Sequence, residues 1–588
     1  MSRLASVIGT LSALLLATAC SDAGVEDSEN AEFPAGKSDG GIEEGSPEAL
    51  GVLALVNDPA MTQAALKADA GVTSKVAKNI VTHRDGADAK AGTADDDTFD
   101  TLAELDAIPF VGPVTLNALL EAAKDKGLVP TKGGAQIDVM FSPLPAAESH
   151  NARVAKLITE AKESVDIAIY SYSDAGIATA LRGAKARGVK IRFLFETANA
   201  DKGISDPAAR ASSKSGRIEA DGIDVRYVNK ILHHKFLIVD GPRDDKKKAE
   251  TAKLAMGSAN WSGTAATVFD ENTLFIQNSA ELSALYQQEF DALWVGSRDF
   301  VGPAAAQPRS TANITPADVT DEAGLDVLFT RANMKAGGAD GATWSTNKAS
   351  TKVADKWVAA IQNAQTSIHI ASGHMRLKPV AEALLAKHAA DPSVDIKVYL
   401  DQQEYISASG NTFQKKEVAD CEAAATTPTA LRDCSEKDFL WSKVLVDAGI
   451  DVRYKSFAYR WDHSYAAQMH SKYMVIDGNQ LISGSYNLSM NSEHSTFENA
   501  LHLTGPQFKP LIQKFEDNFS DIFVTGEGLL DTLRTKISTA ATFPIVFDSM
   551  SLTWSEFDQL RVLIRQNCPL IDSPEFRSNP SAHRTCTR

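Results

Sequence analysis

One pattern occurs twice in this 588-residue chain and limits its fold more than any other feature. It has the form HxKxxxxD and is followed each time by GSxN. The two copies contain His233, Lys235, Asp240, Ser258 and Asn260, and His470, Lys472, Asp477, Ser485 and Asn487. A single HxK is common by chance, but two complete copies with the same downstream turn are not. The chain is therefore a duplication in which two sets of histidine, lysine and asparagine are expected to form one site.

The segments around each copy repeat the same order of apolar strands and helices. Matching strand patterns lie at 137–141 and 325–329, 165–170 and 367–371, 189–194 and 396–400, and 223–227 and 450–454. Strands that alternate with helices predict α/β layers. We expect two similar α/β/α halves with pseudo-twofold symmetry, at residues 136–310 and 322–530, followed by a tail at 531–588. The distance between the copies indicates duplication of a whole domain rather than a solenoid repeat.

The N-terminus predicts export. Arg3, an apolar run at 8–16 and the small residues Ala17-Thr18-Ala19 form a signal peptide at 1–19. Cys20 follows directly, and two outcomes fit: a lipoprotein with lipidated Cys20, or a secreted protein cut before it. The Gly-, Ser- and acid-rich segment 20–46 is expected to be a disordered tether.

Residues 47–130 carry helical patterns on both sides of a turn at 109–113, and a similar helix pair is expected around Gly71. The turn resembles a helix-hairpin-helix module, whose hairpin amides grip a DNA phosphate. Phe110 replaces the first glycine of that hairpin, and acidic residues surround it. A small all-α domain that contacts protein is the preferred alternative. The aspartates near 95–97 lack the EF-hand spacing, so a solvated loop is expected there.

The cysteines after Cys20 are even in number, which in an exported chain predicts disulfides. The expected pairs are Cys421–Cys434 and Cys568–Cys586, with the first pinning a loop at 405–440. The formal net charge of -17 weakly disfavours charge-driven binding to nucleic acid.

The doubled motif suits cleavage of a phosphodiester. Along a strand, His233 and Lys235 share one face, as do His470 and Lys472. One neutral imidazole can attack phosphorus while the other, protonated, protonates the leaving oxygen. The groups expected to bind the phosphate oxygens are Lys235, Ser258, Asn260, Lys472, Ser485 and Asn487. This chemistry requires no metal ion or other cofactor.

Both copies resemble the phospholipase D superfamily, over about residues 136–530. The resemblance implies a phosphohistidine intermediate, with His233 as the nucleophile and His470 as the general acid. It also points to glutamates downstream of each GSxN, here Glu271 and Glu498, as acceptors for the second nitrogen of each histidine. The motif aspartates, Asp240 and Asp477, are expected to be structural.

Export and the acidic charge favour a phospholipase D-like phosphodiesterase that converts phospholipids to phosphatidic acid at a membrane surface. Two alternatives remain: an extracellular, metal-independent endonuclease, favoured if the hairpin module binds DNA, and an inactive protein that only binds phosphate. Because one chain contains both motifs, no homodimer is needed to complete the site.

Overall fold

The computed structural model describes most of the chain, in two compact units that span 1–129 and 130–588. The described residues are 42, 44, 47–86, 90, 93, 96–99, 101–126, 128–129, 135–309, 311, 314, 322–435, 438–458, 466–539, 542–543, 546–567 and 586–587. The predicted signal peptide and Cys20 lie outside them. Cys568 does too, so the predicted Cys568–Cys586 disulfide remains a prediction.

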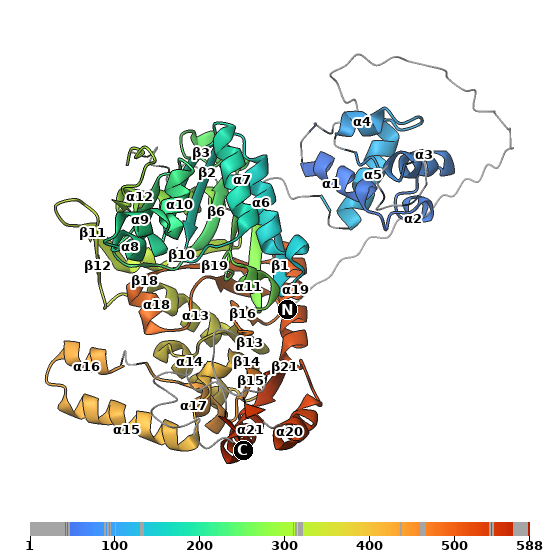
Figure 1. Cartoon of the computed structure of the whole chain (residues 1–588). Helices are drawn as coiled ribbons and strands as arrows, with labels where there is room; N and C mark the ends of the chain where they lie inside the picture. Colours follow the sequence, from blue (N-terminus) through green and yellow to red (C-terminus); the bar gives the residue numbers. More distant parts are fainter. Residues whose placement is uncertain are drawn as a thin grey trace, which may run out of the picture. The chain divides into compact units, whose positions relative to one another are not determined.

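The first unit is all helical, as predicted (Figure 1). Its helices are α1 (Pro47–Asn57), α2 (Gln63–Asp69), α3 (Ser74–Arg84), α4 (Leu102–Asp106) and α5 (Pro113–Asp125). Gly71 lies between α2 and α3 with φ of 65°, and Phe110 lies between α4 and α5 with φ of 71°. Both hairpins thus use the left-handed region, which is easy for glycine and uncommon for phenylalanine. The positive φ explains why helix-hairpin-helix modules favour glycine at the position that Phe110 occupies here.

The predicted tether is wrong at its C-terminal end. Ile42 is buried in the helical core, and the carboxylate of Glu44 accepts the backbone N–H groups of Leu102 and Ala103 at 3.0 and 3.1 Å. These are unpaired donors at the start of α4, which an acidic side chain satisfies and stabilises. The helical unit therefore begins before residue 47.

The first half of the second unit contains an eight-stranded sheet of order β1-β8-β7-β6-β2-β3-β4-β9. Its strands are β1 (Gln136–Ser142), β2 (Ser164–Ile169), β3 (Lys190–Phe195), β4 (Val225–Tyr227), β6 (Lys235–Val239), β7 (Lys253–Gly257), β8 (Glu271–Gln277) and β9 (Arg298–Asp299). Helices α6 (His150–Glu160) and α7 (Ala175–Ala186) cover one face, and α12 (Ala280–Val295) packs on the other. The predicted α/β/α half is confirmed.

The second half repeats this topology in the order β10-β19-β17-β16-β13-β14-β15-β21. Its strands are β10 (Leu325–Phe329), β13 (Ser367–Ser372), β14 (Asp395–Asp401), β15 (Asp451–Ala458), β16 (Lys472–Ile476), β17 (Gln480–Gly484), β19 (Asn499–Thr504) and β21 (Val546–Thr553). Helices α13 (Lys352–Asn363) and α14 (Lys378–Ala390) cover the outer face, and α19 (Lys509–Phe523) packs on the inner one. The predicted duplication is therefore a strand-for-strand repeat.

The two halves share one hydrophobic core. It joins inward-facing residues of both sheets to α12 and α19, with Phe236 and Phe290 from the first half and Tyr473 and Phe515 from the second. Helix α12 contacts β10 of the other half, and α19 contacts β1, beside which it lies in Figure 1. Burying these faces against each other removes apolar surface from water, so the halves form one compact unit.

The predicted boundary of the second half at residue 530 is wrong. The segment after 530 is not a tail, because β21 pairs antiparallel with β15 and completes the second sheet as β9 completes the first. Helices α20 (Leu529–Thr539) and α21 (Trp554–Asn567) add Leu533 and Phe557 to the core of this half. The internal repeat in the sequence did not reveal β9 or β21. Both are edge strands, which are usually short or covered by other elements.

The segment at 405–440 forms helices rather than the expected loop. They are α15 (Ala408–Ala424) and α16 (Pro428–Ser435), and the predicted Cys421–Cys434 disulfide joins them. Helix α15 also contacts α17 (Ser442–Asp447). Within the described part of the chain, no helix has the length and apolar character that crossing a membrane requires.

Candidate active site

The motif histidines are paired with glutamates from the opposite half. Nδ1 of His233 lies 2.8 Å from a carboxylate oxygen of Glu498, and Nδ1 of His470 lies 2.8 Å from one of Glu271. Both glutamates are fully buried. The acceptors predicted downstream of each GSxN are present, but each half holds the histidine of the other. Each Nε2 is thereby left as the nitrogen that can meet a substrate.

Short backbone pairings between the halves produce this exchange. Strand β5 (Ile231–Leu232), just before the first histidine, pairs parallel with β18 (Thr496–Phe497), just before Glu498. The N–H of His233 then donates to the carbonyl of Phe497 at 3.1 Å. In the symmetric position, the N–H of His470 donates to the carbonyl of Asp270 at 2.9 Å.

Two further carboxylates position the motif segments and were missed in the sequence. Glu196, directly after β3, accepts the N–H of Leu232 at 2.6 Å. Asp401, at the end of β14, accepts the N–H of Met469 at 2.9 Å. Burial raises the pKa of both, that of Asp401 to about 7. An acid at the same end of both repeated strands was the signal that could have identified them.

The motif lysines are buried beside the histidines. Each strand begins at the lysine and not at the histidine as predicted, so His233 and His470 lie in the extended connection before β6 and β16. Nζ of Lys235 donates to the carbonyl of His233 at 2.7 Å, and Nζ of Lys472 donates to that of His470. These bonds hold an ammonium group next to each imidazole.

The serines of GSxN do not take the phosphate-binding role predicted for them. The hydroxyl of Ser258 donates to Glu271 at 2.7 Å, and that of Ser485 donates to Glu498 at 2.6 Å. Both serines are fully buried. Since a hydroxyl has one proton to donate, it is used to orient the glutamate.

The glycine before each of these serines allows the close backbone approach that the serine–glutamate hydrogen bonds require. A Cβ on Gly257 would lie 2.3 Å from the carbonyl oxygen of Asn272, and one on Gly484 would lie 2.2 Å from that of Asn499. Each of these asparagines follows a catalytic-site glutamate in sequence. Any other residue would therefore push the serine and the glutamate apart.

The asparagines of GSxN are half-buried at the ends of these turns. Oδ1 of Asn260 and Oδ1 of Asn487 are buried and have no hydrogen-bond partner among the described residues. The backbone carbonyl of Asn260 lies 3.1 Å from Nε2 of His150, a buried residue at the start of α6. His150 has no counterpart in the second half, where Val353 takes the corresponding place, so the repeat gave no signal for it.

The motif aspartates lie away from the histidines and are structural, as predicted. Asp240 accepts the N–H groups of Glu163 and Ser164 at 2.7 and 3.0 Å, ahead of β2. Asp477 accepts those of Thr366 and Ser367 at 2.7 and 3.0 Å, ahead of β13. Both adopt positive φ, 50° and 53°, which aspartate tolerates better than most residues. They tie the motif strand to its neighbour.

Burial and mutual charge shift every titratable group of the site. Burial, followed by the charges of Lys235 and Lys472, lowers the pKa of His233 well below its usual value. Burial, Lys472 and Lys235 do the same for His470. Burial also lowers the pKa of Lys235 to about 7 and that of Lys472 to about 8. The histidines are therefore neutral at neutral pH, as a nucleophile must be.

The two glutamates shift in the opposite direction. Burial raises the pKa of Glu271 and of Glu498 to about 7. Each histidine–glutamate pair can consequently share one proton near neutral pH. Clustered groups with opposed shifts are typical of acid–base sites.

The site is not symmetric at its rim. The ring of Tyr170 packs edge-on against His233, with centroids 4.7 Å apart. The corresponding residue in the second half is Gly373, whose Cβ position lies 3.9 Å from Cα of His470. The side chain of His470 is 20% exposed and that of His233 is 11%. His470 is thus the more accessible of the two.

Comparison with known families gives the assignment. The family described as "Cardiolipin synthase, PLD-like domain" matches residues 154–294 and 357–523, more than half of the chain. The chain belongs to the phospholipase D superfamily. The two matched segments contain both motifs and both glutamates, and His150 lies just before the first segment. The superfamily assignment supports activity as a phosphoric diester hydrolase.

Individual relatives match shorter segments. A mitochondrial cardiolipin hydrolase of Xenopus tropicalis is 29% identical over 154 residues, 26% of this chain and 64% of that protein. A phospholipase D of Rickettsia conorii is 34% identical over 137 residues, 23% of this chain and 60% of that protein. The match thus spans less than two thirds of either relative.

Two solved structures also overlap with this chain. Nuc of Salmonella typhimurium, a phospholipase D family member, is 28% identical, with 28% of this chain and 97% of that chain covered and a TM-score of 0.23. Phosphatidylserine synthase of Haemophilus influenzae is 14% identical, with 66% and 86% covered and a TM-score of 0.40. The family assignment rests on the sequence match and not on these overlaps.

Proposed function

We propose that this protein is an exported phospholipase D-like phosphodiesterase that hydrolyses phospholipids to phosphatidic acid. The observation that carries the chemistry is the crossed pair of dyads, His233–Glu498 and His470–Glu271. Both dyads are intact and buried, and a lysine accompanies each. An inactive phosphate-binding protein would have no need to keep two such pairs.

In the proposed mechanism, Nε2 of His233 attacks phosphorus and the bond from phosphorus to the head-group oxygen breaks. Nε2 of His470 gives its proton to that leaving oxygen, while the proton between Nδ1 of His470 and Glu271 stays on Nδ1, so that the imidazole ends neutral beside a carboxylate. Water then attacks the phosphohistidine, gives its proton to His470, and breaks the phosphorus–nitrogen bond. Lys235, Lys472, Asn260 and Asn487 bind the phosphate oxygens, and their donors offset the charge that develops there.

The greater exposure of His470 supports this order of roles. The general acid and base must reach both the leaving alcohol and the incoming water, whereas the nucleophile needs only phosphorus. Tyr170 screens His233 from solvent, which protects the phosphohistidine from water arriving on its own side.

A lipid is the preferred substrate because the named relatives are a cardiolipin hydrolase and a phospholipase D. The predicted export signal fits a substrate at a membrane surface, as does the lipoprotein alternative in which Cys20 is lipidated. The competing substrate is DNA, which the two helix hairpins around Gly71 and Phe110 favour. The formal charge of -17 counts against it.

A paired assay tests this proposal. The full mature chain is incubated, with a metal chelator present, with phosphatidylcholine or cardiolipin vesicles in one arm and with single-stranded and plasmid DNA in the other. His233→Ala is the inactive variant, and His388→Ala, on the outer helix α14, is the matched histidine control. Phosphatidic acid formed by the wild type and the control, but not by His233→Ala, supports the proposal. Cleaved DNA with intact lipid would replace it by the nuclease alternative, and no product in either arm would leave it without support.

A further inference from the structure

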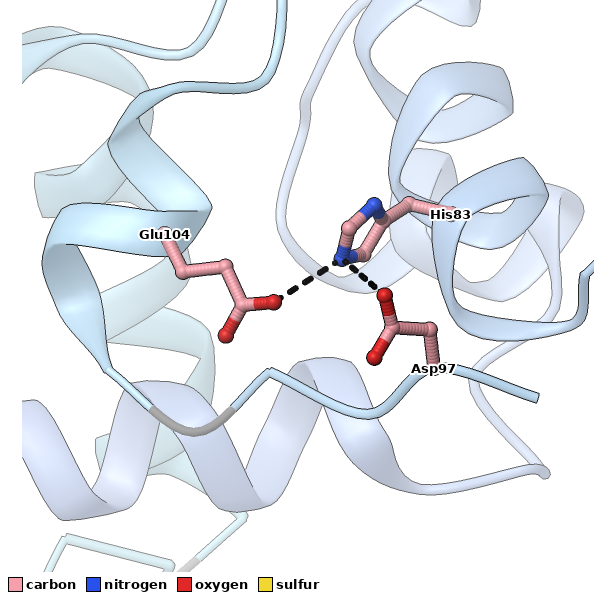
Figure 2. A group of neighbouring side chains, drawn as sticks. All are labelled: His83, Asp97 and Glu104. Carbon is pink, nitrogen blue, oxygen red and sulfur yellow. Dashed lines mark hydrogen bonds and ion pairs between the residues drawn. The ribbon is translucent and has the colours of Figure 1, made fainter.

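Three side chains of the helical unit converge on one point, far from the catalytic chemistry in sequence. His83 comes from the last turn of α3, Asp97 from the connection after it, and Glu104 from α4 (Figure 2). Nε2 of His83 lies 3.2 Å from a carboxylate oxygen of Glu104 and 3.7 Å from one of Asp97. Figure 2 shows both carboxylates directed at this same nitrogen. The three potential ligand atoms all lie within 4.8 Å of one another.

The surrounding structure fixes this arrangement. The imidazole of His83 stacks on the buried ring of Phe99, with centroids 4.5 Å apart and planes at 26°. Phe99 is held by Asn57, whose side chain accepts its N–H and donates to its carbonyl, both at 2.9 Å. The N–H of Asp97 donates to the carbonyl of Arg84 at 3.0 Å. The residues that present Nε2 and Asp97 are therefore set in place by buried contacts and backbone bonds.

Two carboxylates approach one nitrogen of His83. Nε2 of His83 carries at most one proton and can donate to one carboxylate at a time. A divalent cation at the point of convergence would neutralise both charges and accept the nitrogen lone pair. For zinc, with bonds of about 2.0 to 2.2 Å, tetrahedral ligands are separated by about 3.3 to 3.6 Å. The observed 3.2 and 3.7 Å bracket that range.

We propose that His83, Asp97 and Glu104 bind one divalent transition-metal ion of the zinc type, with water completing the coordination. The imidazole ligand favours zinc over calcium and magnesium, which take oxygen ligands. Asp97 is 70% exposed, so the ion can enter from solvent. The ion would fasten residues 96–99 to α3 and α4, and so join the two helix hairpins.

The other acidic cluster in the described chain carries no such inference. Glu219, Asp224 and Asp299 also approach one another, but they include no histidine. Each accepts a backbone N–H: Glu219 from Val225, Asp224 from Gln307, and Asp299 from Val301. These bonds account for that cluster without an ion. Asp97 belongs to the acidic loop that was expected to be solvated, and it is 70% exposed, yet its carboxylate also approaches His83 on α3.

Zinc binding by the full mature chain tests the proposal. The protein is freed of metal by a chelator, dialysed, and titrated with zinc chloride by calorimetry, with excess calcium and magnesium present. The isosteric variants Asp97→Asn and Glu104→Gln each remove one ligand charge, and His83→Asn removes the nitrogen ligand. Asp106→Asn is the matched control, because Asp106 is an exposed acid of the same helix outside the cluster. Circular dichroism verifies that every variant is folded.

We expect the wild type and Asp106→Asn to bind one zinc ion that each cluster variant loses or binds at least about tenfold more weakly. Comparing variants with the wild type removes any contribution from zinc at the catalytic histidines. Hydrogen exchange of peptides from 85–101 should slow with zinc in the wild type and not in Glu104→Gln. Equal zinc binding by all proteins, or none by the wild type, would show that the three side chains form only an ion-paired cluster.

Discussion

Glu498 of the second half is hydrogen-bonded to His233 of the first, and the reciprocal pair, Glu271 with His470, crosses in the other direction. Neither half can therefore form a working dyad without its partner. The duplication is functional as well as architectural, because one catalytic centre is assembled from two incomplete ones. This relationship makes the two glutamates unequal in their effects on the two chemical steps.

Glu498→Gln should slow formation of the phosphohistidine, because His233 loses the acceptor that orients it as a nucleophile. We expect a fall in kcat of about 100-fold or more. Glu271→Gln weakens His470 both as acid and as base, so with an activated leaving group such as p-nitrophenol, which needs no protonation, it should instead slow breakdown. The phosphoenzyme trapped by acid quench should be scarce in the first variant and abundant in the second. The reverse pattern would make His470 the nucleophile.

The KM of the enzyme should rise with pH through the range in which the buried lysines lose their protons. The pKa of Lys235 is lowered to about 7 and that of Lys472 to about 8, so their positive charge is present below this range and lost above it. An anionic substrate binds the charged form, so KM should increase by up to about tenfold per pH unit above pH 8. Steady-state kinetics from about pH 6 to about pH 9 measure this. Lys235→Arg, which stays protonated, should remove the part of the rise near pH 7 and leave the part near pH 8 that Lys472 causes. An unchanged profile would contradict the assignment.

Asp240→Ala should destabilise the fold without removing a catalytic group. The variant loses the acceptor for the N–H groups of Glu163 and Ser164 and places alanine at a φ of 50°. We expect the free energy of unfolding to fall by about 2 kcal/mol in urea titration. Asp244→Ala, an exposed acid in the following turn, should change it little. A large loss of kcat in a folded Asp240→Ala enzyme would argue for a direct catalytic role.

Asp270→Asn should weaken the contact between the two halves on one side of the pseudo-twofold axis. Asp270 of the first half forms a buried ion pair with Lys455 of the second at 2.7 Å. Leaving Lys455 buried and unpaired should lower the free energy of unfolding by about 3 to 5 kcal/mol. The corresponding positions on the other side carry Val228 and Phe497, both buried in the shared core.

The double variant Lys455→Val/Asp270→Phe copies that apolar side and provides the control. It should be more stable than Asp270→Asn, because no charge is left buried. An equal decrease in the free energy of unfolding in the single and the double variant would show that the ion pair does not couple the halves. Thermal unfolding of the three proteins and the wild type gives the comparison.

The sequence by itself determined the duplication, the α/β/α class and the histidine, lysine and glutamate members of the site. These features depend on residue type and on spacing within one half. The second copy of the pattern shows that the spacing is not accidental. It also predicted Cys421–Cys434 and the hairpins around Gly71 and Phe110, because turns and a pair of nearby cysteines are local signals. The structural role expected for Asp240 and Asp477 came from the family resemblance and not from a local signal.

The tertiary structure alone decided which residues meet. No spacing in the sequence showed that each glutamate crosses to the other half, since this depends on pairing between β5 and β18 over a long sequence separation. Nor did it show that Ser258 and Ser485 use their single hydroxyl proton on a glutamate rather than on phosphate. β21 completes the second sheet by pairing with β15 over a long sequence separation. His83 is placed near Asp97 by stacking on Phe99, which Asn57 at the end of α1 holds. Contacts of this kind arise from three-dimensional packing, which one-dimensional patterns do not record.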